Sequence, residues 1–172
     1  IGGGDIALRK VKLLVKAGPK ITVISRVVCK DLKELLKKYG HKAIIKSFQE
    51  ADLKKPILII AATNSPTTNK RISTYAQQNN ILINVVDQPK LCTFTMGSIV
   101  ERDSLVISIS SGGKAPVLVR NIREKIETLI PQSYAELVNF SGNLRSIVKK
   151  NIQSGMKRRI FWEEFFKSDY IQ

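Results

Sequence analysis

The first seven residues have the types and spacing of a turn that binds phosphate groups. Gly2, Gly4 and Ala7 fit the pattern G-x-G-x-x-A, which lets a backbone turn tightly and approach a pyrophosphate closely. The amides at the start of the following helix then face the phosphates, and the helix dipole favours their charge. A glycine-rich turn can also be purely structural, so this pattern alone leaves nucleotide binding open.

Polar side chains follow two apolar stretches that have the character of buried strands. Thr63 and Asn64 come directly after residues 57–62, and Asp87 follows residues 81–86. In an open parallel sheet, ligands bind beyond the carboxyl ends of the strands. We therefore expect these polar side chains to lie at the same edge as the glycine turn.

The identity of the dinucleotide is left open by the residue that follows the second expected strand. A NAD site usually has an acidic side chain there to hold the ribose hydroxyls, but this sequence has Arg26, and Asp31 comes several residues later. Arg26 could accept a 2′-phosphate, which would admit NADP, or it could merely flank the strand. The sequence supports both interpretations.

Asp87 is the acidic residue best placed for chemistry. Its carboxylate would stand at the mouth of the cleft, where it could accept a proton. The alternative is a purely structural residue that closes the strand in an Asx turn, because turns favour Asp for that reason alone.

A second glycine-rich stretch could bind anions. Ser111, Gly112, Gly113 and Lys114 precede a helix, and the lysine adds positive charge. The stretch lacks the G-x-x-x-x-G-K-[ST] spacing of a Walker motif. His41 and two cysteines are too few for a zinc finger, and we expect no metal site. His41 lies beside basic residues and is expected to be a solvated surface residue. Cys92 lies in a strand-like run and is expected to be buried rather than reactive.

Strands that alternate with helices position these residues in a parallel sheet with right-handed crossovers. Because only Ile1 precedes Gly2, we expect the numbering to begin inside the first strand of this sheet. Further strands are expected at residues 21–24, 42–47, 57–62 and 81–86. Helices are expected at residues 5–17, 31–39 and 66–80, with Ser65 as the N-cap of the last of them.

The pattern changes after Pro89. Residues 93–100 and 105–110 predict a strand pair joined by a polar turn, and a helix follows from Pro116 to about residue 130. From Ser133 onward the sequence is helical, and the aromatic residues near its end suit helix packing. The fold class is therefore α/β: a Rossmann-like domain, a small α/β region and a helical C-terminal region.

The charge of the chain indicates an anionic partner. Lys and Arg outnumber Asp and Glu by 29 to 14, which gives a net charge of +15. Nucleic acid, an anionic membrane surface, a polyanionic substrate or a lysine-rich proteome could each explain it. The basic stretches lack the interleaved aromatic residues of a single-strand binding groove. No apolar run is long enough to span a membrane, and two cysteines predict a reducing, cytoplasmic setting.

The order of motifs resembles one family. IGGGDIALRK, AATN, NVVDQPK, a strand pair, SSGGKAPVLVRNIREKIE and RRIFWEEFF follow one another over nearly the whole chain. This arrangement is similar to the siroheme synthase N-terminal family, which comprises precorrin-2 dehydrogenases, some of them also sirohydrochlorin ferrochelatases. No methyltransferase domain follows, so we expect the stand-alone dehydrogenase form.

The resemblance implies a NAD-binding Rossmann domain at residues 1–96, a dimerisation region at 97–130 and a helical C-terminal region at 131–172. It implies a cytoplasmic homodimer whose subunits exchange elements around the active site. The family's essential aspartate corresponds to Asp87, and a serine that is phosphorylated in some members corresponds to Ser111. With the polar strand ends included, the expected NAD-binding residues are Gly2, Gly4, Asp5, Ile6, Arg26, Val27, Thr63 and Asn64.

A tetrapyrrole substrate with many carboxylates would explain the positive charge, since a cationic surface attracts and orients a polyanion. The expected substrate-binding residues are Ser111, Gly112, Gly113, Lys114, Arg120 and Arg123. Oxidation of precorrin-2 would pass a hydride to NAD and a proton to a base, for which Asp87 is the candidate.

Two alternatives stay open. The enzyme could also insert Fe²⁺ into sirohydrochlorin, with iron as a substrate and Asp87 taking the pyrrole protons. A module of another class, which senses a nucleotide and binds nucleic acid, is disfavoured because the sequence has no known recognition motif. We therefore expect neither nucleic-acid nor membrane partners.

Overall fold

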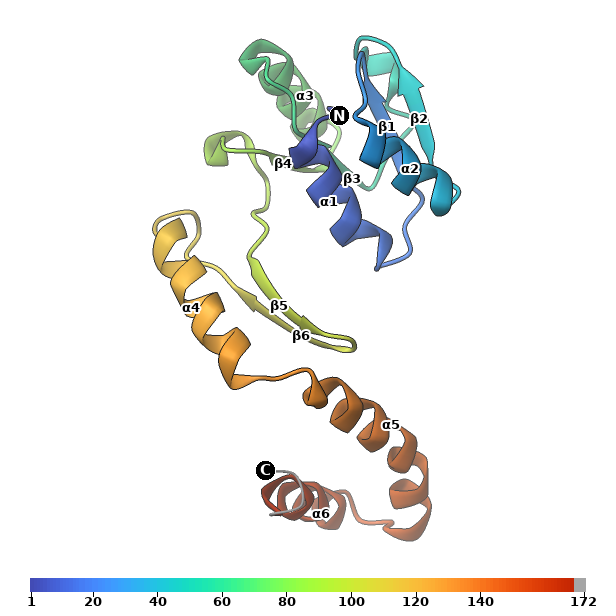
Figure 1. Ribbon diagram of the computed structural model, residues 1–172, viewed down its shortest axis with the longest axis vertical. Helices are drawn as coiled ribbons and strands as arrows, with labels where there is room; N and C mark the ends of the chain where they lie inside the picture. Colours follow the sequence, from blue (N-terminus) through green and yellow to red (C-terminus); the bar gives the residue numbers. More distant parts are fainter. Residues whose placement is uncertain (169–172) are drawn as a thin grey trace. The chain divides into compact units, whose positions relative to one another are not determined.

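The computed structural model describes residues 1–168. The chain divides into two compact units, Ile1–Met96 and Gly97 onward, and each is described by itself (Figure 1). Residues 169–172, the end of the predicted C-terminal region, lie outside the described residues.

The first unit contains two pairs of parallel strands. Strand β1 (Thr22–Ser25) pairs with β2 (Lys42–Ile45), and β3 (Leu58–Ala61) pairs with β4 (Leu82–Val85). Each pair is in register from its first residue to its last, so the carboxyl ends lie level. The predicted parallel arrangement is therefore present in both pairs.

Ile1 and Gly2 connect the two pairs through backbone hydrogen bonds. The amide of Gly2 donates to the carbonyl of Ile24 at 3.0 Å, and the nitrogen of Ile1 donates to the carbonyl of Ile60 at 2.6 Å. The amide of Ala62 donates back to Ile1 at 2.7 Å. The spatial order is therefore β2, β1, residues 1–2, β3 and β4. A cavity of about 890 Å³ also lies between β1 and β3, and it is lined mainly by their apolar side chains and those of the first helix.

Three helices connect these strands, close to the predicted bounds. They are α1 (Asp5–Val15), α2 (Lys30–Lys38) and α3 (Pro66–Gln78). Gly40 follows α2 with φ of +68°, a left-handed conformation that favours glycine after a helix end. The side chain of Ser65 accepts a hydrogen bond from the amide of Thr68, so the predicted N-cap of α3 is confirmed.

The buried residues of the first unit form two clusters. One joins α1, β1 and α2, and its central side chains are Leu32 and Leu36. The other joins β3, β4 and α3 around Ile72 and Ile83, which are both fully buried. Ile57 was expected in a buried strand but is 87% exposed, because β3 begins only at Leu58.

The second unit begins with an antiparallel hairpin, as predicted. It consists of β5 (Ser98–Arg102) and β6 (Leu105–Ile109), joined by a tight turn in which Asp103 has φ of +55°. The expected strand at residues 93–100 is shorter than predicted, since residues 93–97 are not in a strand. The reason lies in the first unit, where Thr93 and Phe94 accept hydrogen bonds from β4.

Three helices complete the second unit: α4 (Pro116–Leu129), α5 (Ser133–Asn151) and α6 (Gly155–Lys167). The guanidinium of Arg102 donates to the carbonyls of Ile130 at 2.7 Å and Glu127 at 2.9 Å, which fastens β5 to the end of α4. Aromatic rings of α6 contact one another and Phe140 of α5, so they serve helix packing as expected. Among residues 1–168, no helix is long and apolar enough to cross a membrane.

The packing around Leu32 yields a test of the first unit's core. Replacing Leu32, which is fully buried, with alanine should lower the free energy of unfolding by about 2–5 kcal/mol, because the methyl groups leave a cavity behind. Lys33→Ala on the exposed side of the same helix is the control and should change it by less than about 0.5 kcal/mol. Urea denaturation measures both, and equal midpoints for the two variants would contradict the described core.

Candidate functional site

Gly2 and Gly3 form the tight part of the turn before α1. A Cβ atom on Gly2 would lie 2.1 Å from the carbonyl oxygen of Ala62, and Gly2 has φ of +114°. A Cβ atom on Gly3 would lie 2.0 Å from the carbonyl oxygen of Val27. The amide of Cys29 also donates to the carbonyl of Gly3 at 2.8 Å. This turn therefore holds the segments that follow β1 and β3 in direct contact with the start of α1.

Gly4 has the opposite environment. A Cβ atom at this position would meet no described atom within 4 Å, and the residue is exposed. Gly4 is the N-cap of α1, and because glycine has no side chain, its position offers no cap to the amides of the first helical turn. The predicted pattern named Gly2 and Gly4 and passed over Gly3. The structure shows that Gly2 and Gly3 are required by packing, whereas Gly4 leaves room for a ligand.

Buried Asn69 of α3 orders the polar segment after β3. The hydroxyl of Thr63 donates to Oδ1 of Asn69 at 2.7 Å, and Nδ2 of Asn69 donates to the carbonyl of Thr63 at 3.1 Å. Asn69 is 2% exposed, whereas the neighbouring Asn64 is exposed. Asn69 was missed by the sequence analysis, since only the folded backbone brings it to Thr63.

Asp87 lies at the same edge of the sheet as the glycine turn. The amide of Val86 donates to the carbonyl of Ala61 at 2.9 Å, and the next residue, Ala62, contacts Gly2. Asp87 follows directly, with an exposed side chain and φ of +58°. The expected convergence of the strand ends around the turn is therefore present.

The Asx-turn interpretation of Asp87 is wrong. Such a turn requires the backbone N–H two residues further on, and that residue is Pro89, which has none. Within residues 1–168, no hydrogen bond to the Asp87 carboxylate is present, so the side chain has no structural bond of that kind.

Lys10 of α1 is a charged neighbour of Asp87 that the sequence analysis did not single out. Its ammonium donates to Sδ of Met96 at 3.5 Å. Burial and then the positive charge of Arg9 lower the pKa of Lys10, while the negative charge of Asp87 acts in the opposite direction. No spacing rule points to Lys10, because its approach to Asp87 depends on how α1 packs.

The segment after β1 carries the remaining predicted cofactor residues of the first unit. Arg26 and Val27 are exposed there, beside the Gly3 contact, and Asp5 and Ile6 occupy the first turn of α1. Asp31 lies in the first turn of α2, not at the strand end. The position where NAD sites have an acidic residue therefore carries Arg26, as the sequence indicated.

The predicted substrate-binding residues all lie in the second unit. The hydroxyl of Ser111 accepts a hydrogen bond from the amide of Ala115 at 2.9 Å and thereby shapes the turn before α4. Gly112 and Gly113 both have positive φ, and Lys114 is exposed.

Two arginines follow on α4. Arg120 is exposed, whereas Arg123 forms ion pairs with Glu127 and Glu124. The positive charge of Arg123 is thus partly neutralised by its neighbours, whereas Lys114 and Arg120 are exposed.

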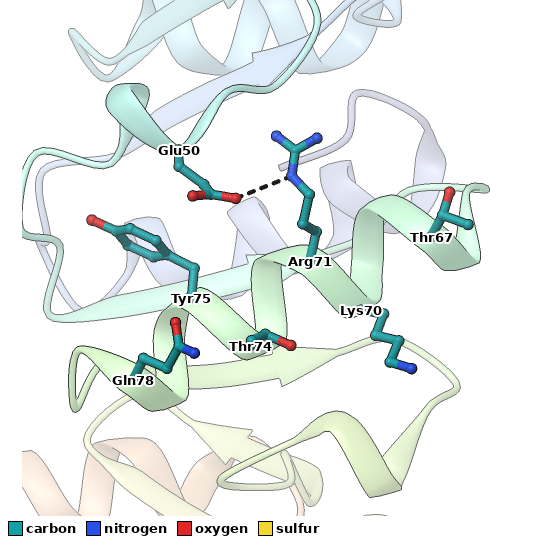
Figure 2. Close-up of a pocket in the computed structure, with 7 residues that line it drawn as sticks. All are labelled: Glu50, Thr67, Lys70, Arg71, Thr74, Tyr75 and Gln78. Carbon is teal, nitrogen blue, oxygen red and sulfur yellow. Dashed lines mark hydrogen bonds and ion pairs between the residues drawn. The ribbon is translucent and has the colours of Figure 1, made fainter.

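A separate shallow pocket of about 350 Å³ lies along α3 (Figure 2). An ion pair between Glu50 and Arg71 at 3.1 Å crosses it, and none of the predicted site residues lines it. Among residues 1–168, no group of three His, Cys, Asp or Glu side chains is placed to hold a metal ion. Cys92 is half-buried as a free thiol and follows a 3₁₀ turn, so its predicted place in a strand was wrong.

Three family models match the chain in succession. The first, described as "Putative NAD(P)-binding", matches residues 1–98. The second, the sirohaem biosynthesis protein central region, matches residues 102–129. The third, the sirohaem synthase dimerisation region, matches residues 133–172.

The relatives agree with these models. Siroheme synthases of Vesicomyosocius okutanii and Methylobacillus flagellatus are each 46% identical, over 96% and 97% of this chain. The chain spans 36% of the length of each of these curated relatives. A solved structure described as SirC, a precorrin-2 dehydrogenase, matches 99% of the chain and 83% of its own, with a TM-score of 0.81 and 24% identity. This likeness confirms the α/β, Rossmann-like fold. The chain belongs to the siroheme synthase N-terminal family, and its first part is an NAD(P)-binding domain.

Proposed function

We propose that this chain oxidises precorrin-2 to sirohydrochlorin with NAD⁺ as the acceptor. The observation that carries the proposal is the placement of Asp87, whose carboxylate makes no described hydrogen bond, at the strand edge beside the open Gly4 turn. Family membership supplies the substrate class, because its relatives are siroheme synthases.

The residues around Gly4 fit a dinucleotide. The space beside Gly4 and the uncapped amides at the start of α1 suit a pyrophosphate, whose charge the helix dipole favours. Arg26, Thr63 and Asn64 stand at the neighbouring strand ends, where the ribose and nicotinamide halves of a dinucleotide lie in such folds. When bound, NAD⁺ supplies the hydride acceptor, and the choice between NAD and NADP rests on Arg26.

Asp87 is proposed as the proton acceptor. Its carboxylate is exposed and makes no hydrogen bond within residues 1–168, so it is free to take a proton from the substrate. Exposed Lys114 and Arg120 are proposed to bind carboxylates of the tetrapyrrole, which the overall positive charge would attract. Ferrochelation stays a prediction, and an assay of Fe²⁺ insertion into sirohydrochlorin tests it.

A homodimer is proposed from the second unit. Its last part matches a dimerisation region, and it exposes large apolar side chains that include Val106, Leu118 and Ile147. A second copy of the chain would cover such surface.

Gly4→Val tests the cofactor site. The valine should weaken NAD⁺ binding roughly tenfold or more by filling the space for the pyrophosphate, while the melting temperature falls only slightly, because no described atom is near and valine is merely a poorer N-cap. Gly3→Ala is the contrasting variant and should lower the melting temperature, since its Cβ meets the Val27 carbonyl. Calorimetric titration and thermal unfolding measure both, and undiminished NAD⁺ affinity in Gly4→Val would show that the turn is only structural.

Asp87→Asn tests the proton acceptor. Asparagine tolerates the left-handed backbone as well as aspartate does, so the fold should persist while kcat falls roughly tenfold or more. The matched control is Asp103→Asn, the same change at another left-handed position, which should keep wild-type turnover. Formation of reduced cofactor from precorrin-2 measures both rates. A wild-type rate in Asp87→Asn would remove Asp87 from the chemistry.

Ile147→Glu tests the dimer. Light scattering should give about twice the chain mass of 19.3 kDa for the wild type and a shift toward one chain mass for the variant, since a buried unpaired charge is costly. Lys149→Glu, on the other side of the same helix, is the control for a change of charge and should leave the dimer intact. A wild-type chain that stays monomeric at micromolar concentration would contradict the proposed assembly.

A further inference from the structure

The segment that carries Asp87 is held against β4 by side chains rather than by another strand. Among the described strands, β4 pairs only with β3, which leaves its other edge without a strand partner. Residues 86–94 turn back along that edge and include a 3₁₀ turn, Pro89–Leu91. Asp87 is the second residue of this returning segment.

Two side chains satisfy the outward amides of β4. The amide of Ile83 donates to Oγ1 of Thr93 at 2.9 Å, and the amide of Val85 donates to Sγ of Cys92 at 3.1 Å. Alternate amides of a strand point to the same side, so these two bonds replace the ladder that a neighbouring strand would supply. The amide of Thr93 also donates to the carbonyl of Ile83 at 2.9 Å, so the end of the segment is bonded to β4 through its backbone as well.

The thiol of Cys92 joins both sides of Asp87. Its sulfur lies 3.3 Å from the carbonyl oxygen of Val85, two residues before Asp87, and 3.4 Å from the carbonyl oxygen of Gln88, one residue after it, so its single proton can be donated to either. Nδ2 of Asn84 lies 3.8 Å from the same sulfur and donates to the carbonyl of Phe94 at 3.2 Å. Cys92 therefore acts as a clamp: its sulfur bonds the backbone of Val85 and of Gln88, on either side of Asp87.

Helix α3 holds the residue that precedes Cys92. Ser73 of α3 is 1% exposed, and its hydroxyl donates to the carbonyl of Leu91 at 2.7 Å. Gln77, one helical turn later, donates to the Ser73 hydroxyl at 3.0 Å. The residue before Cys92 is thus fixed to the core, and the sulfur has a defined position from which to bond β4.

Asp87 needs such support because of its backbone. A φ of +58° is uncommon for a residue other than glycine and persists only where the surroundings impose it. The Asp87 carboxylate makes no described bond of its own, so the backbone on either side sets where its Cα–Cβ bond points and which positions the carboxylate can reach. That backbone is the part that Cys92 bonds.

We infer that Cys92 is a positioning residue, whose thiol holds the strained backbone at Asp87 so that the carboxylate faces the substrate. The inference rests on the proposed function, since it assigns Cys92 a role in the same reaction. Cys92 contributes no chemistry in this assignment. A misplacement of about 1 Å at a reacting group can cost on the order of a hundredfold in rate, so the loss of such a clamp has a measurable effect.

The test compares Cys92→Ala and Cys92→Ser in the full chain. Alanine removes both hydrogen-bonding functions and should lower kcat with precorrin-2 roughly ten- to hundredfold, with unchanged affinity for NAD⁺. Serine keeps a donor and an acceptor and should recover much of the lost rate. Cys29→Ala, which removes the other half-buried thiol, is the matched control and should turn over like the wild type.

Two further measurements separate positioning from general destabilisation. Cys92→Ala should have no additional effect on kcat in an Asp87→Asn background, because the clamp acts only through that carboxylate. Hydrogen exchange should become roughly tenfold faster at the Val85 amide in Cys92→Ala, while the amides of β1 keep their protection.

The outcomes distinguish the inference from the proposed function. A wild-type chain that fails to reduce NAD⁺ with precorrin-2 overturns the proposed function and the assigned role together. With an active wild type, the inference alone is overturned if Cys92→Ala keeps the wild-type rate. It is overturned equally if the effects of Cys92→Ala and Asp87→Asn multiply in the double variant.

Discussion

The close approach of two glycine backbones to their neighbours is the constraint on which the site depends. Gly2 lies against the carbonyl of Ala62 and Gly3 against that of Val27, at distances that no side chain could occupy. These contacts bring the segments that follow β1 and β3 to the start of α1. Thr63 follows β3, which is bonded to Ile1, and Asp87 follows β4, which pairs with β3, so both are placed relative to this junction.

Around that junction, polar side chains of neighbouring elements bond the segments that carry the candidate residues. Asn69 holds the segment of Thr63 from inside α3, and Cys92 holds the segment of Asp87 from the edge of β4. In both places a side chain satisfies backbone groups that regular structure leaves free at the end or edge of a strand. This support leaves the exposed side chains of Asn64 and Asp87 without a hydrogen bond among residues 1–168, whereas the hydroxyl of Thr63 is used within its own segment. Of the side-chain nitrogen and oxygen atoms buried within residues 1–168, none lacks a hydrogen-bond partner.

The sequence was sufficient where structure is decided locally. Ser65 and Gly40 mark helix ends through bonds and dihedral angles that involve only nearby residues, and both were predicted. Residues 93–97 were predicted as a strand because their composition suits one, but bonds to β4 hold Thr93 and Phe94 in another conformation. The roles of Gly3, Asn69 and Cys92 depend on contacts between segments far apart in the chain, and no pattern of spacing contains that information.

The environment of Asp87 supports the proposal that its carboxylate takes part in chemistry. An Asx turn would require a backbone donor at position 89, and proline removes that donor. Asp87 does lie in a backbone turn, which the amide of Gln88 closes by donating to the carbonyl of Val85 at 3.3 Å, but this turn makes no use of the carboxylate. The chain nevertheless keeps an acidic side chain there, in a left-handed backbone conformation that glycine or asparagine would also accept, and orders the flanking residues with buried polar groups. Packing explains the support but gives no reason for the carboxylate. A function that uses the negative charge does explain it, and proton transfer next to a bound dinucleotide is such a function.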